Sequence, residues 1–125
     1  MEETTTAIDA AIERRNESFA ELLFTLIDKR NLTDSEVYKA ANVSRKTFSD
    51  IRHGLIPKKI TVIKFIFALE LPLNEAEILL KQAGYALSTS IETDLIVAHF
   101  IAQKNFDKFA LDDALAKKNL PKIFA

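Results

Sequence analysis

The sequence predicts an all-α protein, and three observations support that prediction. Only 2 Gly and 3 Pro occur in 125 residues, too few for the many turns of an all-β fold. Apolar residues recur at helical spacing along most of the chain. Residues that favour helix N-termini precede several of these apolar segments. Because 48% of the residues are hydrophobic, the chain can build a core, and we expect one compact helical body.

The N-terminal region predicts two helices separated by a break. Thr4 to Arg15 has apolar residues at the spacing of a short amphipathic helix. Asn16 to Ser18 is expected to interrupt it. A second helix is predicted from about Ser18 to Arg30, and its inward face consists of Phe19, Leu22, Leu23, Leu26 and Ile27.

The next segment predicts a helix-turn-helix that consists of two capped helices and the turn between them. Thr33 is expected to cap the first helix, and Glu36 completes a capping box. Asn42 stands at the turn, where Asn tolerates a left-handed backbone better than most residues. Ser44 caps the second helix, which Gly54 ends.

Four further helices are predicted along the rest of the chain. We expect them near residues 57–70, 75–83, 91–103 and 107–118, with Pro57 starting the first and Asn74 capping the second. The chain then divides into three parts. These are an N-terminal amphipathic helix (1–17), a helix-turn-helix domain (18–84) and a C-terminal helical extension (85–125) packed on the same domain.

Positive charge is concentrated around the second helix of the capped pair. The whole chain has a formal net charge of −1. Between Val43 and Lys64, however, six cations and one anion give a local net charge of +5, which leaves −6 for the remainder. Charge segregated in this way focuses potential on one surface. A surface of this kind suits an anionic partner such as duplex DNA.

The second helix of the capped pair is also expected to present polar side chains outward. Phe48 and Ile51 share one face and should pack inward on Val37, Ala41 and Val43. The outward residues are then Arg45, Lys46, Ser49 and Asp50. In a major groove, Arg recognises guanine and Ser bonds to either base edge. The helix N-termini at Thr33 and Ser44 suit phosphate groups.

This segment resembles the helix-turn-helix of the XRE family, the phage-repressor (Cro) type. The family pattern is roughly T-Q-x-E-L-A-x-x-x-G-V-S-x-x-x-I-S-x-x-E-x-G. Identical residues are Thr33, Glu36, Val43, Ser44, Ser49 and Gly54, and the similarity continues through Pro57 and Thr61–Leu69. The resemblance covers about residues 18–84 and implies a five-helix repressor-like domain, here with an extra N-terminal helix and about two C-terminal helices. Ala83–Ser88, Asp94–Val97 and Phe100–Ile101 are similar to an extension found on a group of small bacterial XRE-like proteins.

The resemblance implies a sequence-specific DNA-binding transcription regulator, a bacterial or phage repressor, with the helix at residues 44–53 in the major groove. The residues predicted to face bases are Arg45, Lys46, Ser49 and Asp50. The residues predicted to contact the DNA backbone are Thr33, Ser44, Thr47, Lys58, Lys59 and Lys64. For the three lysines, an ordinary solvated helix surface is an equal alternative.

Three residues depart from the family pattern and favour a second hypothesis. Asp34 replaces a Gln that contacts the DNA backbone in the family, and Tyr38 replaces a small residue between the two helices. Asp50 stands at a base-reading position, where a carboxylate accepts from cytosine but repels phosphate if it is misplaced. The alternative is therefore a protein-interaction adaptor or regulatory subunit that keeps the fold without binding DNA.

The sequence gives no sign of catalysis, a metal site or a cofactor. The chain has no Cys, and His53 and His99 have no cluster of further ligands at metal-binding spacing. Asp112 with Asp113, and Glu75 with Glu77, are too close in sequence to converge, so they are interpreted as charges near helix N-termini. We predict that the protein is not an enzyme.

A cytoplasmic location without membrane contact is expected. The longest apolar stretch, Ile60 to Leu73, is too short to span a bilayer and contains charged residues, and the acidic N-terminus is unlike a signal peptide. A homodimer is slightly favoured, because one helix-turn-helix contacts only a few base pairs. The apolar residues of the C-terminal part either pack on the core or form a dimer surface, and they are Phe106, Phe109, Ile123 and Phe124.

Overall fold

The computed structural model describes the backbone of residues 2–125 and the side chains of residues 4–12 and 19–125. Within that range the chain forms seven helices and no strand, which confirms the all-α prediction. The helices are α1 (Glu2–Lys29), α2 (Asp34–Ala40), α3 (Arg45–Arg52), α4 (Lys59–Leu69), α5 (Leu73–Gln82), α6 (Glu92–Ala102) and α7 (Lys108–Lys117). None of the helices in the described range is long and apolar enough to cross a membrane.

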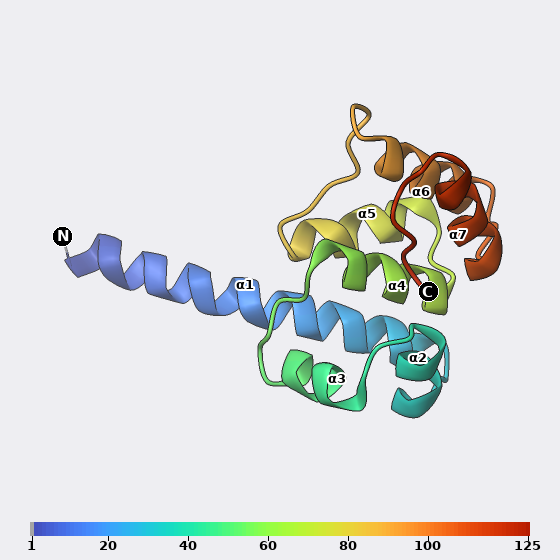
Figure 1. Cartoon of the computed structure of the whole chain (residues 1–125). Helices are drawn as coiled ribbons and strands as arrows, with labels where there is room; N and C mark the ends of the chain where they lie inside the picture. The colour runs from blue at the N-terminus through green and yellow to red at the C-terminus, as the bar shows by residue number, and fades with distance from the viewer. Residues whose placement is uncertain (1) are drawn as a thin grey trace.

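The first helix is longer than predicted. The expected break at Asn16 to Ser18 is wrong, because α1 continues from Glu2 to Lys29. No Pro or Gly lies in this stretch, and Asn or Ser inside a helix costs only up to about 0.7 kcal/mol relative to Ala. Figure 1 shows the N-terminal half of α1 projecting from the other helices. Ile8 and Ile12 in this half are exposed.

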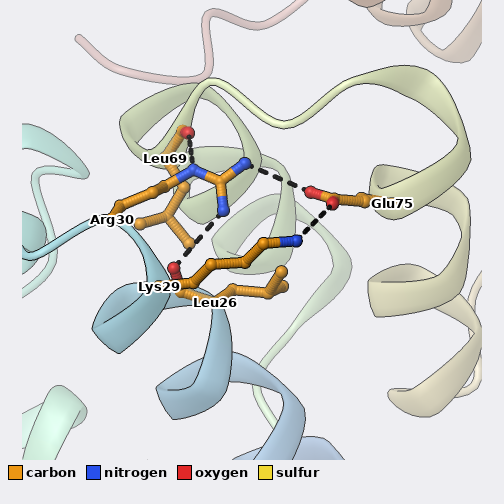
Figure 2. A network of polar contacts seen from close by, with 5 residues as sticks. All are labelled: Leu26, Lys29, Arg30, Leu69 and Glu75. Carbon is orange, nitrogen blue, oxygen red and sulfur yellow. Dashed lines mark hydrogen bonds and ion pairs between the residues drawn. The ribbon is translucent and has the colours of Figure 1, made fainter.

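A network around Arg30 fixes the C-terminal end of α1 (Figure 2). The Arg30 guanidinium donates from Nε to the Leu69 carbonyl oxygen at 2.8 Å and from Nη1 to the Leu26 carbonyl oxygen at 3.3 Å. Its Nη2 donates to a Glu75 carboxylate oxygen at 3.1 Å, and Lys29 Nζ lies 3.7 Å from the other Glu75 oxygen. One side chain therefore satisfies carbonyl groups near the ends of two helices and joins α1 to α4 and α5.

The buried side chains form one apolar cluster to which all seven helices contribute. Helix α4 supplies six of its buried residues, and Ile123 near the chain end supplies another. The predicted inward face of α2, α3 and the turn between them is confirmed, since Val37, Ala41, Val43, Phe48 and Ile51 are all buried. The Phe48 ring is central to it, because it packs against rings from α1, α2 and α4, namely Phe24, Tyr38 and Phe65.

Most predicted helix ends are confirmed. Thr33 and Glu36 form the capping box of α2, and Asn42 adopts the left-handed backbone with φ 54°. Gly54 follows α3 with φ 107°. The predicted Asn74 cap is wrong, because α5 already begins at Leu73. Pro72 precedes that helix, and its fixed φ suits a helix start.

Candidate nucleic-acid interface

Helix α3 presents its polar face to solvent. It lies at the edge of the molecule in Figure 1, with α1 drawn between it and α4. Arg45, Lys46 and Ser49 are exposed, and Asp50 is partly exposed. The opposite face is fixed by buried Phe48. The residues predicted to face bases therefore occupy one accessible surface on a helix that is held from behind.

The N-terminus of α3 is closed by a hydroxyl pair. Ser44 Oγ accepts the Thr47 N–H at 3.0 Å and donates to Thr47 Oγ1 at 2.9 Å. Ser44 is exposed and Thr47 partly exposed. Two of the three predicted backbone-contacting hydroxyls thus stand at the positive end of the α3 dipole, where an anion is favoured.

Two of the three anions on α2 and α3, Asp34 and Asp50, are each paired with a cation. Asp50 lies 3.2 Å from Lys46 Nζ on the same helix, and Asp34 accepts from Arg52 Nη2 at 2.6 Å. The Arg52 guanidinium also lies over the Phe24 ring, 4.1 Å from its centre. Both ion pairs are solvent-exposed, so they contribute little to stability and can exchange partners readily.

Arg45 differs from these cations. Within the described part of the chain it makes no ion pair with a carboxylate, and it stays exposed. It lines a shallow hollow of about 290 Å³ between α2 and α3, together with Tyr38, Ser49 and Arg52. The Tyr38 ring packs on the Phe48 ring, with 5.6 Å between the ring centres. Tyr38 therefore fills space between α2 and α3.

The other predicted backbone contacts lie in different surroundings. The Thr33 hydroxyl donates to the Glu36 carboxylate at 3.0 Å, and Asp34 is the next residue. Lys58 is exposed at the N-cap of α4, and Lys64 is partly buried. Among the described residues, no hydrogen bond or ion pair joins either of these lysines to α3.

Lys59 points toward the C-terminal extension. Its Nζ donates to Asp94 Oδ2 on α6 at 2.6 Å, and the Asp94 side chain is only 4% exposed. The same carboxylate oxygen accepts the Ser88 N–H at 2.8 Å. The ammonium group of Lys59 is therefore occupied by an internal partner, which the helical spacing of α4 alone could not reveal.

Two residues outside the predicted set also have defined roles. His53 Nδ1 lies 2.8 Å from the Ser49 carbonyl oxygen, near the end of α3. Asp112 was predicted to be a charge near a helix N-terminus, but it is buried and binds backbone N–H groups near the chain end. Among the described residues, no group of three or more His, Cys, Asp or Glu could hold a metal ion.

Neither family models nor curated proteins nor solved structures gave a match to this chain. The resemblance to the XRE family therefore stays a prediction. The function has to be inferred from the surface of α3 and its surroundings.

Proposed function

We propose that the protein is a cytoplasmic, sequence-specific DNA-binding transcription regulator, with α1 to α5 as a repressor-like helix-turn-helix domain. The observation that supports this most is the exposed polar face of α3, which begins at a capped N-terminus and is backed by buried Phe48 and Ile51. A rigid helix with Arg and hydroxyl groups on one accessible face suits insertion into a major groove.

In this proposal Arg45 contacts a guanine edge, and Ser49 bonds to a neighbouring base. The Lys46–Asp50 pair opens on binding, which places Lys46 toward guanine or phosphate and leaves Asp50 to accept from a cytosine amino group. The exposed Lys46–Asp50 contact costs little to break. These four residues would determine which sequence is bound.

The proposed backbone contacts are fewer than the sequence predicts. Ser44 and Thr47 stand at the α3 N-terminus, and Lys58 and Lys64 remain as cations without a carboxylate partner among the described side chains. Lys59 leaves the set because Asp94 binds its ammonium group. Thr33 leaves it because its hydroxyl is bonded to Glu36, whose charge repels phosphate.

A protein-interaction module is the second candidate, and one observation favours it. From Thr33 to Gly54 the chain has four cations and three anions, so the helix-turn-helix has a net charge of only +1. The Asp34–Arg52 pair neutralises part of the surface that a DNA backbone would approach. In this alternative, the hollow beside Tyr38 accepts a side chain of a partner protein.

Binding to pooled duplex DNA fragments, titrated with salt and followed by sequencing of the bound fraction, tests the proposal. We expect enrichment of a defined site and a loss of affinity as salt rises, since phosphate contacts release counterions. Arg45→Ala should weaken binding at that site by about 1–3 kcal/mol. Lys81→Ala, which removes an exposed cation on α5, is the matched control and should bind like the wild type. Failure to retain any duplex would contradict the proposal and favour the interaction module.

A further inference from the structure

The end of the chain returns to the helix-turn-helix. In Figure 1 the segment after α7 crosses back, and the C-terminus lies near the ends of α4 and α2. Ile123 is buried, and Phe124 is partly buried against the core. Ile123 and Phe124 are therefore packed on the body of the protein.

A buried carboxylate holds this segment. Asp112 is 7% exposed, and its Oδ1 accepts the Ile123 N–H at 2.8 Å. The Phe124 N–H lies 3.2 Å from each of the two Asp112 oxygens. Hydrogen bonds from backbone N–H groups to an ionised carboxylate are stronger than those between neutral groups. Asp112 thus fixes the course of residues 123 and 124.

Phe124 in turn contacts the turn between α2 and α3. Its carbonyl oxygen accepts from Asn42 Nδ2 at 3.0 Å, and its ring packs on Phe67, 5.8 Å between ring centres. Lys108 Nζ on α7 adds two longer bonds of 3.4 Å to the Ala40 carbonyl oxygen and to Asn42 Oδ1. Both ends of the Asn42 amide therefore bond to the C-terminal extension.

These contacts give Asn42 a role beyond its backbone conformation. A left-handed residue between two helices is accommodated most easily by Gly, so the conformation alone does not require an amide side chain. The amide instead joins the turn to residues 66 and 82 positions away in the sequence. The turn sets the direction in which α3 leaves α2, so whatever fixes the turn also fixes α3.

We propose that Asp112, Phe124 and Asn42 form a clasp by which the C-terminal extension positions α3. Asn42 and Asp112 are positioning residues, since they act through the turn and do not lie on the α3 face. That the clasp fixes the α2–α3 turn does not depend on the function of the protein. Its effect on DNA binding rests on the proposed function. Release of the clasp should loosen the α2–α3 turn and weaken duplex binding without removing any DNA-contacting side chain.

The test compares Asn42→Gly and Asp112→Asn, singly and together, with the control Asn31→Gly. Gly keeps the left-handed backbone and removes the side chain that carries the amide. Asn31 has the same φ of 54°, and its side chain makes no hydrogen bond among the described residues. Hydrogen exchange of the Val43 amide, which donates to the Tyr38 carbonyl oxygen at 2.9 Å, measures opening of the turn. Duplex affinity is measured on the same samples.

We expect each clasp variant to speed exchange at Val43 by roughly threefold to tenfold, the range for loss of one hydrogen bond. Duplex affinity should fall by a similar factor, and the double variant should match a single one because both changes open the same clasp. Asn31→Gly should change neither. Exchange at Val43 that is unchanged in both single variants would overturn the clasp.

The two proposals can fail separately. If the wild-type protein binds no duplex, the proposed function fails, and hydrogen exchange still decides whether the clasp exists. If hydrogen exchange at the turn rises while duplex affinity stays at the wild-type value, the clasp fixes the turn but does not position α3 for DNA binding. The claim that the clasp positions α3 is then overturned.

Discussion

Lys58 and Lys59 are adjacent residues with the same charge, yet they lie in different surroundings. Lys58 is exposed before the first turn of α4, whereas Lys59 donates to the buried Asp94 carboxylate at 2.6 Å. Without Lys59, the Ser88 N–H would be the one hydrogen-bond partner left to that carboxylate among the described residues. A buried charge that loses its counter-ion destabilises the fold, because its desolvation is no longer offset.

We expect Lys59→Met to lower the free energy of unfolding by about 1–3 kcal/mol, the range for leaving a buried polar group unsatisfied. Lys58→Met should change it by less than about 0.5 kcal/mol, as is usual for surface substitutions. The two variants should have the opposite ranking in duplex binding. Lys58→Met should have the larger effect there, because loss of this cation should reduce the slope of binding affinity against salt by about 1. Urea unfolding and salt-titrated binding check both effects. Equal stability of the two variants would argue against the Lys59–Asp94 contact.

Exposure of single residues could be predicted from the sequence, but their long-range partners could not. Helical spacing was enough to place Phe48 inward and Arg45 outward. The pairing of Lys59 with Asp94 joins residues 35 positions apart, and it depends on how α6 packs beside the start of α4. No local pattern in the sequence contains that information.

At the scale of the helix, α3 depends on its N-terminal cap. The helix has only eight residues, so its own backbone bonds stabilise it weakly, and tertiary packing must supply the rest. Ser44 satisfies the Thr47 N–H at 3.0 Å, while Phe48 and Ile51 anchor the buried face. The exposed face can therefore vary in sequence without loss of the helix.

Ser44→Ala should cost about 1 kcal/mol of stability, because Ala cannot accept the Thr47 N–H. Ser44→Gly should cost only a few tenths of a kcal/mol (about 0.3), since Gly is itself tolerated at the N-cap. Urea unfolding of the two variants gives the comparison. No loss of stability in Ser44→Ala would indicate that the cap hydrogen bond does not stabilise α3.

Helix ends were predictable where they depend on local chemistry. The Thr33 capping box and the left-handed Asn42 involve residues within one turn of each other, and both are confirmed. The break predicted at Asn16 to Ser18 fails because residues with weak helix preference need not end a helix. The role of Asp112 was missed because its partners lie in the segment after α7, whose path depends on tertiary packing.

At the scale of the molecule, the C-terminal extension shares the core with α1 to α5. Leu111 and Leu115 on α7 are fully buried in the same cluster as Phe19 and Leu23 on α1. A shared core couples the two parts, so they should unfold together rather than in separate steps.

Leu115→Ala and Leu23→Ala should therefore each lower the midpoint of one common unfolding transition, with a loss of about 2–5 kcal/mol per truncated leucine. Unfolding in urea, followed by helical circular dichroism and by Tyr fluorescence, tests this expectation. Two separate transitions in Leu115→Ala, the earlier one involving only the extension, would show that the extension is an independent unit.

Direct mapping of the duplex-binding surface tests the central claim, that the outer face of α3 enters DNA. Backbone amide resonances of the full chain would be followed by NMR as the duplex enriched from the pool is added at low salt. We predict that the largest shifts fall on residues 44–53, with smaller changes near Lys58 and none on α5. Shifts centred on another surface, or none at excess duplex, would contradict the claim.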